Sequence, residues 1–263
     1  MVTRTPPCDA GAFMRSSRRD LLRWTTVALV ASACRKKPMP DVRHRPLASL
    51  PTTTLPWLSL RDHFIATVGP SAGQGSRLGP LLVLADATFA PRSRFPLHPH
   101  QEIEILSIVI DGDLSHHGDQ AHGATLKKRD VQLISSRDGM THAEGNETDT
   151  STRMLQLWFE PTSHGGAPAY FHRTVGVGSR QPVAGDDVLP LRCDAKVWWS
   201  DVTGTETVTV APGRAAYVMA LTAPVALSTG VTLATGEGAE VGVGEVQLTA
   251  SSAAVLIIDV PRS

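Results

Sequence analysis

The sequence predicts an all-β protein that folds as two consecutive halves. From about Trp57 to the end of the chain, short apolar runs alternate with turn residues. The chain holds 22 glycines and 19 prolines but only 5% aromatic residues, a composition that favours turns and short strands over long helices. A Gly- and Pro-rich stretch at 160–192 divides the runs into two sets.

Size and composition limit the functions open to this chain. With 263 residues, 41% of them hydrophobic, it can bury the core of one large or two modest domains. Its formal net charge is zero and it has no long basic run after the N-terminal segment, which argues against a nucleic-acid partner. The three cysteines form no C-x-x-C pair, and two of them lie near the N-terminus, so we expect neither a zinc ribbon nor an internal disulfide framework.

Residues 1–34 are predicted to be a twin-arginine-type export signal. Ser17–Arg23 holds the paired arginines, and the apolar stretch that follows is too short to span a bilayer. Ala31-Ser32-Ala33 suits signal cleavage, whereas the same residues with Cys34 resemble a lipobox whose cysteine is lipidated. The protein is thus expected in the periplasm, free or anchored to the membrane through Cys34. A basic amphipathic helix is the alternative interpretation.

Residues 35–56 are rich in Pro and Thr and are predicted to be a disordered linker. The first half follows at 57–165. A Gly-Pro pair precedes its first predicted strand, and an Asp-Gly pair, a hairpin signal, ends the second. The predicted strands are residues 81–85, 103–110, 131–134 and 154–159.

Residues 166–192 are predicted to connect the halves, and residues 193–263 to form the second one. Turn residues such as Pro212-Gly213 separate its short apolar runs. The predicted strands are residues 196–199, 208–210, 216–220, 246–249 and 254–260. Many short strands at regular spacing are typical of sandwiches and barrels.

Two segments of the first half, His98-Pro99-His100 and His142-Ala143-Glu144, predict a site for one divalent metal ion. Residues two positions apart in a strand project to the same side, so each segment offers two ligands. Two such strands facing each other inside a barrel would surround one ion. Three imidazoles and one carboxylate suit Fe(II), Mn(II), Ni(II), Cu(II) or Zn(II), and they leave coordination positions open for substrate or O₂.

Three further histidines, His116, His117 and His122, cluster in a predicted loop. A solvated turn is the simpler interpretation, and an accessory metal site is the alternative. No histidine follows His172, so the second half is expected to bind no metal.

The motifs around the two segments resemble those of the pirin family, a branch of the cupin superfamily. HPHQEIE at 98–104 with VIDGDLSH at 109–116 resembles the first cupin motif as pirins carry it. RDVQLIS at 129–135 with GMTHAE at 139–144 resembles the second, and Asn146 completes the cupin pattern G-x-x-H-x-x-x-N. A weaker likeness to bacterial pirin-like proteins extends from about Trp57 to Pro261.

The resemblance implies a bicupin, that is, two double-stranded β-helix (jelly-roll) barrels in tandem with the metal in the N-terminal one. It places the family's four ligands on His98, His100, His142 and Glu144, and it favours Fe(II). The general cupin pattern would instead use the glutamate that follows the H-x-H pair, here Glu104. We expect Glu104 to be a pocket residue rather than a ligand.

The resemblance also implies a metal-dependent dioxygenase that cleaves flavonols such as quercetin with O₂, with Glu144 as the proton acceptor. The partners would then be a small aromatic substrate and O₂, and the protein is expected to be a monomer. The alternative is a non-catalytic metal-binding sensor or interaction module of the pirin type. A cupin enzyme with another substrate is a third interpretation, because a fold does not fix a reaction.

Overall fold

The computed structural model describes residues 39–262, which lie within one compact unit and are built almost entirely of β-strands. The one helical element in this range is the short 3₁₀ turn η1 (Leu47–Ser49), and no helix there is long and apolar enough to cross a membrane. The predicted all-β class is therefore confirmed. The predicted export signal at 1–34, with Cys34, lies outside the described residues.

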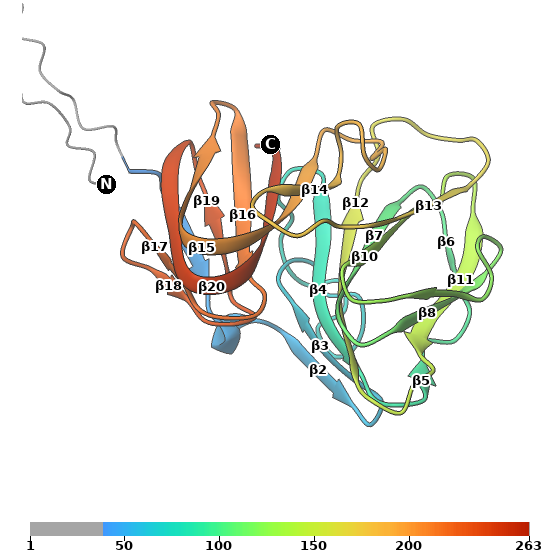
Figure 1. The fold of residues 1–263 in the computed structure, drawn as a ribbon. Helices are drawn as coiled ribbons and strands as arrows, with labels where there is room; N and C mark the ends of the chain where they lie inside the picture. Colours follow the sequence, from blue (N-terminus) through green and yellow to red (C-terminus); the bar gives the residue numbers. More distant parts are fainter. Residues whose placement is uncertain (1–38, 263) are drawn as a thin grey trace, which may run out of the picture. The chain divides into compact units, whose positions relative to one another are not determined.

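The first barrel is made of two sheets (Figure 1). The larger has the order β13-β10-β7-β12-β4-β3-β2, and the smaller has the order β5-β11-β8-β9 with β6 paired to β11. The strands are β2 (Thr52–Leu55), β3 (Leu58–Asp62), β4 (Leu81–Phe89), β5 (Ser93–Arg94), β6 (His98–His100), β7 (Glu104–Asp111), β8 (Leu114–Gly118), β9 (Ala124–Leu126), β10 (Asp130–Ser135), β11 (Met140–Asn146), β12 (Thr152–Phe159) and β13 (Ala169–Thr174).

The second barrel is a single eight-stranded sheet with the order β1-β19-β16-β20-β15-β14, to which β17 and β18 add a small hairpin. Its two longest strands, β15 (Lys196–Val210) and β20 (Gly244–Pro261), pair along almost their whole length, and a register shift between Val202 and Gly204 interrupts the ladder. Figure 1 shows both of them curving around this barrel. The strands are β1 (Val42–Arg45), β14 (Gln181–Ala184), β15 (Lys196–Val210), β16 (Arg214–Ala220), β17 (Val225–Leu227), β18 (Thr232–Leu233), β19 (Gly238–Val241) and β20 (Gly244–Pro261).

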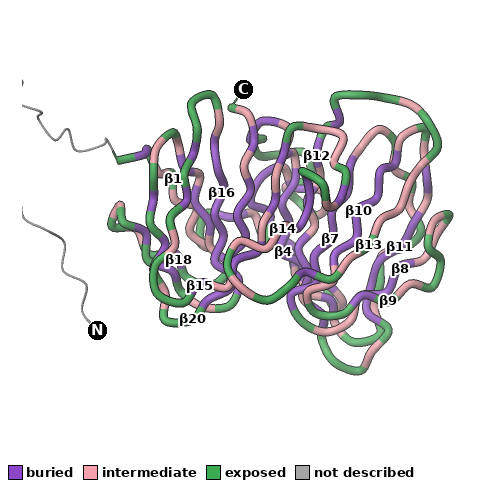
Figure 2. Tube along the Cα trace, turned by 45° about the horizontal axis from the view of Figure 1, so that its top comes forward, coloured by how far each residue is buried: buried purple, intermediate pink, exposed green. Residues whose placement is uncertain are grey.

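Side-chain alternation on the large sheet of the first barrel separates two environments. On β7, Leu106 and Ile108 point outward into a cluster that also contains Trp199 and Tyr217 of the second barrel. Ser107 and Val109 point to the opposite face, into the interior of the first barrel. Figure 2 shows β7 buried along nearly its whole length, whereas no residue of the edge strand β13 is buried.

Two expectations about chain organisation are wrong for the described residues. The described part of the predicted linker, 39–56, contains β1, which pairs with β19, and β2, which pairs with β3. The predicted connector, 166–192, contains β13 and β14, which extend the sheets of the first and second barrel respectively. All four strands lie at sheet ends, where a single neighbour suffices, so their sequences lack the apolar runs of central strands.

Candidate metal centre

Strand pairing brings the two predicted ligand segments side by side. β6 runs antiparallel to β11, and His98 lies opposite His142. β11 also pairs with β8, where Glu144 lies opposite His116. Gly118 permits the approach of β8, because a Cβ atom there would lie only 2.7 Å from the Cα atom of His142. The local pairing, rather than a long loop, therefore sets the geometry of this centre.

The rings of His98, His100 and His142 face one another. Their centroids lie 4.7 Å apart for His98 and His142, 4.8 Å for His98 and His100, and 4.9 Å for His100 and His142. Each ring offers one nitrogen, and the three nitrogens lie within 4.8 Å of one another. Ligands about 2.0 to 2.1 Å from a shared ion have separations of this size. Three of the four predicted ligands therefore form one group.

The carboxylate of Glu144 belongs to a neighbouring group. It gathers with His142 and His116, and the ligand atoms of these three side chains also lie within 4.8 Å of one another. All three are buried. His142 is thus the member that joins the two groups, and Glu144 adjoins the three-histidine group through it.

Three donors hold the Glu144 carboxylate in place. Ser107 donates its hydroxyl to Oε1 at 2.6 Å, and the Gln132 amide donates to the same oxygen. The Gln156 amide donates to Oε2. Hydrogen bonds of this kind orient a ligating carboxylate and stabilise its charge inside a barrel.

The tautomer of His98 and the unpaired ring nitrogens of His142 both suit metal binding. His98 donates through Nδ1 to the Pro96 carbonyl at 2.8 Å, so its Nε2 carries the free lone pair. Both ring nitrogens of His142 are buried and have no hydrogen-bond partner. Unpaired polar atoms in an interior are costly, and an ion bound to one of these nitrogens satisfies it.

Burial also keeps the imidazoles of His142 and His100 neutral, the form that binds metal. It lowers the pKa of His142 to about 3, and the nearby His98 and His116 lower it in the same direction. Burial likewise lowers the pKa of His100 to about 3, together with the charges of His142 and His98. For Glu144, burial raises the pKa.

His116 is the residue of this centre that the sequence reasoning missed, because it was grouped with a solvated loop. β8 buries it completely, and its Nε2 donates to the Gln120 carbonyl at 2.9 Å. Predicting a strand instead of a loop at 114–118 would have found it, because Leu114 and His116 then share the inward face.

The other two histidines of that cluster lie apart from the centre. His117 contacts Glu147 through Nε2 at 2.7 Å, and its ring centroid lies 5.2 Å from that of His122. Among residues 39–262, no group of three metal-ligating side chains includes either histidine. The predicted solvated turn therefore fits His122, which is exposed in a turn, whereas His117 lies on strand β8 and is partly buried.

The expectation that Glu104 lines the pocket is wrong. On β7 it lies on the opposite face from Ser107, whose hydroxyl reaches Glu144. Glu104 shares its face with Leu106, toward the second barrel, and accepts a 2.5 Å hydrogen bond from the Ser135 hydroxyl. A sequence motif alone does not show which face of β7 each side chain occupies. Because Glu104 lies on the face away from the metal centre, it is not part of that centre.

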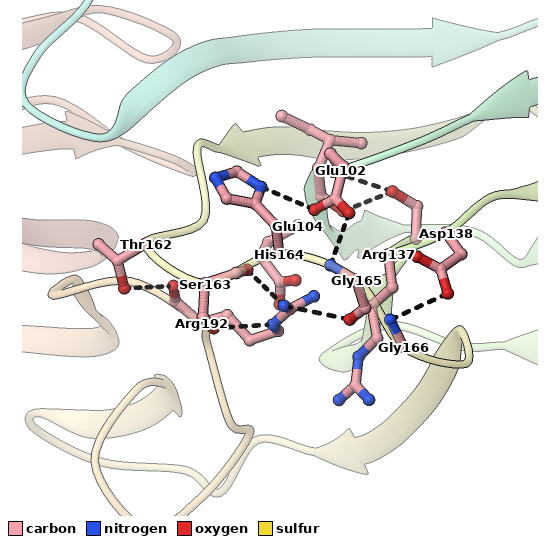
Figure 3. Close-up of polar contacts among 12 residues, drawn as sticks. Glu102, Glu104, Arg137, Asp138, Thr162, Ser163, His164, Gly165, Gly166 and Arg192 are labelled. Atoms are coloured by element: carbon pink, nitrogen blue, oxygen red, sulfur yellow. Dashed lines mark hydrogen bonds and ion pairs between the residues drawn. The ribbon is translucent and has the colours of Figure 1, made fainter.

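The turn that follows β6 is fastened by Glu102 (Figure 3). Its φ of 51° lies in the left-handed region, which is strained for a residue other than glycine. Its carboxylate accepts hydrogen bonds from Nδ1 of His164 at 2.9 Å and from the backbone N–H of Gly165 at 2.7 Å, and its own N–H donates to the Arg137 carbonyl. These bonds fix the chain two residues after His100.

A cavity of about 270 Å³ opens beside the centre. Most of its wall is apolar, and two of the predicted ligands, His98 and Glu144, face it. The lining residues are Thr67, Val68, Phe95, Pro96, His98, Glu144, Gln156 and Trp158. A small and largely apolar molecule therefore has a place next to the ligands.

Known proteins share this sequence pattern. The sequence model of the Pirin family matches residues 45–159. A pirin-like protein of Caulobacter vibrioides is 34% identical over 167 residues, which cover 60% of this chain and 72% of that protein. The chain belongs to the pirin family. A further relative of this pirin, the quercetin 2,3-dioxygenase of Escherichia coli K12, is 26% identical over 166 residues, covering 60% of this chain and 71% of the relative.

Solved structures show the same fold. YhhW from Escherichia coli superposes with a TM-score of 0.78 at 21% sequence identity, covering 85% of this pirin and 99% of YhhW. YhhW is described as a bacterial pirin, and it has also been solved in complex with nickel(II). The predicted tandem of two cupin barrels, and the predicted family, are confirmed.

Proposed function

We propose that this pirin holds one divalent transition metal ion on His98, His100, His142 and Glu144, and that it cleaves a flavonol such as quercetin with O₂. The observation that carries the proposal is the convergence of three imidazoles beside a buried carboxylate, at the wall of a cavity. We favour Fe(II) on the strength of the family resemblance, and the same donors also suit Mn(II), Ni(II), Cu(II) and Zn(II).

Each side chain has a role in this reaction. When bound, the ion supplies the Lewis acidity and redox capacity that side chains lack. The three histidines direct their ring-nitrogen lone pairs at the metal position. Glu144 accepts the proton of the substrate hydroxyl. Burial raises the pKa of this carboxyl group, which makes the carboxylate a stronger proton acceptor. Phe95 and Trp158 exclude water from the aromatic body of the substrate.

The relatives support this class of reaction. The Escherichia coli relative carries the name quercetin 2,3-dioxygenase, and YhhW accepts nickel(II). The alternative, a non-catalytic metal-binding sensor or interaction module, uses the same four side chains without turnover. Only a test of turnover separates the two.

The test measures metal content by mass spectrometry and O₂ uptake with quercetin and with luteolin, which lacks the 3-hydroxyl group. We expect uptake and carbon monoxide release with quercetin alone.

Glu144→Gln should lower kcat by a factor of about 100 or more, because the proton acceptor is lost. His172→Gln, a half-exposed histidine outside the centre, is the control. A metal-loaded protein that consumes no O₂ with any flavonol would contradict the enzyme and leave the binding module.

A further inference from the structure

One of the three donors to Glu144 differs from the others in where it lies. Ser107 and Gln132 are fully buried behind the carboxylate, on β7 and β10. Gln156, on β12, is only partly buried and lines the cavity together with Glu144. A molecule that enters the cavity therefore meets the Gln156 side chain and the Glu144 carboxylate together.

Chemistry fixes the direction of the Gln156 amide. The indole N–H of Trp158 can only donate, and it lies 3.2 Å from Oε1 of Gln156. The carbonyl end of the amide therefore faces Trp158, and the NH₂ end faces Glu144. Trp158 is itself held against the ring of His100, with centroids 5.1 Å apart at 82°. The indole thus ties the amide to the three-histidine group.

This arrangement leaves one hydrogen of the amide available. An NH₂ group has two donors, and Gln156 uses one of them for Oε2 of Glu144. Within residues 39–262, no second acceptor contacts this nitrogen. Since the side chain lines the cavity, the remaining N–H can reach an oxygen of a bound molecule that lies beside Glu144.

We propose that Gln156 is a positioning residue that recognises a carbonyl oxygen on the substrate, next to the hydroxyl whose proton goes to Glu144. The substrate class is then a planar aromatic compound with a hydroxyl group and a carbonyl group on adjacent carbons. Its body packs on the apolar wall that includes Val68, Phe95 and Pro96. The inference rests on the proposed function, because it names the recognition that this same site would use.

Binding to a redox-inert holoprotein tests the inference without turnover. The protein is loaded with Zn(II), and its affinity for 3-hydroxyflavone, and for flavone as the analogue without the hydroxyl, is measured by absorbance titration. Gln156→Leu, compared with the wild type after both have been loaded to equal zinc content, should bind 3-hydroxyflavone about tenfold more weakly, the effect of one hydrogen bond. It should also shift the absorption band of the bound probe, which responds to hydrogen bonding at the carbonyl.

Two further variants keep the test decisive. Gln247→Leu, the same change at an exposed position of the second barrel, should bind like the wild type. Trp158→Phe keeps an aromatic ring beside His100 but frees the amide, so it should weaken binding by a smaller factor. This variant carries the test if Gln156→Leu does not fold.

The outcomes separate this inference from the proposed function. Wild-type affinity and an unshifted band in zinc-loaded Gln156→Leu would overturn the role of Gln156. A wild-type protein that binds flavone as well as 3-hydroxyflavone would contradict the contact between the substrate hydroxyl and Glu144, because flavone keeps the carbonyl and lacks only the hydroxyl. Tenfold weaker binding by the variant, in a protein that does not consume O₂ with quercetin, would support the recognition and contradict the dioxygenase.

Discussion

The two barrels share a fold but differ in what they bury. Among residues 39–262, sixteen polar or charged side chains are buried, and all of them except Ser200 lie between Thr53 and Thr152. The cluster inside the second barrel consists only of Val, Ala, Leu and Ile. Buried polar groups reduce stability unless they are paired, whereas a fully apolar interior adds to it. One barrel is thus suited to chemistry, and the other to holding the molecule together.

The largest effect is expected from replacing His142, the residue that both ligand groups share. His142→Ala should weaken metal binding by a factor of at least about 100, because a ligand is lost from the centre of the first barrel. Metal content after dialysis, measured by mass spectrometry, reports this. His172→Ala should keep full occupancy. A His142→Ala protein that retains its metal would contradict the assigned centre and erase the contrast between the barrels.

The second prediction concerns the apolar barrel. Leu248 is completely buried in its core, so Leu248→Ala should lower the free energy of unfolding by about 2 to 5 kcal/mol through lost burial and a cavity. Urea unfolding measures this, with Leu97→Ala, an exposed position, as a control expected within about 0.5 kcal/mol of the wild type. Metal affinity of the folded variant should not change. A lower metal affinity in folded Leu248→Ala would contradict the assignment of metal binding to the first barrel and of stability to the second.

The smallest effect concerns a carboxyl group inside the first barrel. Both oxygens of Asp62 are buried without a partner, and burial raises its pKa from 3.8 to about 7. The folded protein then keeps a proton that the unfolded chain releases above pH 3.8, so this group makes stability fall as pH rises from about 4 to 7. Asp62→Asn should therefore stabilise the protein by about 1 to 3 kcal/mol at pH 8 and have little effect at pH 4.

A buried histidine sets the background for that measurement. Burial lowers the pKa of His63 from 6.5 to about 4, so its contribution to stability is present above pH 6.5 and is lost as pH falls to 4. This slope opposes that of Asp62, but it is the same in wild type and Asp62→Asn. The difference between the two unfolding curves therefore isolates Asp62. An unchanged difference from pH 4 to 8 would contradict the raised pKa.

The sequence predicted those features that depend on local alternation. His98 and His100 share a face because they lie two apart in one strand, as do His142 and Glu144, and this rule needs no knowledge of the partner strand. His116 and Gln132 joined the centre only through the pairing of β8 with β11 and of β10 with β7, which are contacts between distant segments. Glu104 was misplaced because the phase of β7 depends on its neighbours in the sheet.

Strand boundaries were predictable only where burial is strong. The apolar runs of β4, β7, β10 and β12 revealed the central strands. β15 and β20 are 15 and 18 residues long and pass through exposed, polar positions midway, so the sequence predicted each of them only as separate shorter pieces. What keeps those stretches in strand form is the ladder between them, which a single sequence does not display.

The pairing of β1 with β19 has a consequence for how the molecule is assembled during synthesis. β1 is the first described strand to leave the ribosome, yet it closes the edge of the barrel that is made last, and its Arg45 bonds with Glu240, 195 positions away. The nascent chain must therefore hold this segment unpaired until nearly all of the protein has been translated. Contacts of such long range slow folding and prolong exposure to aggregation. A fragment that starts at residue 193 would lack this strand and present a bare sheet edge.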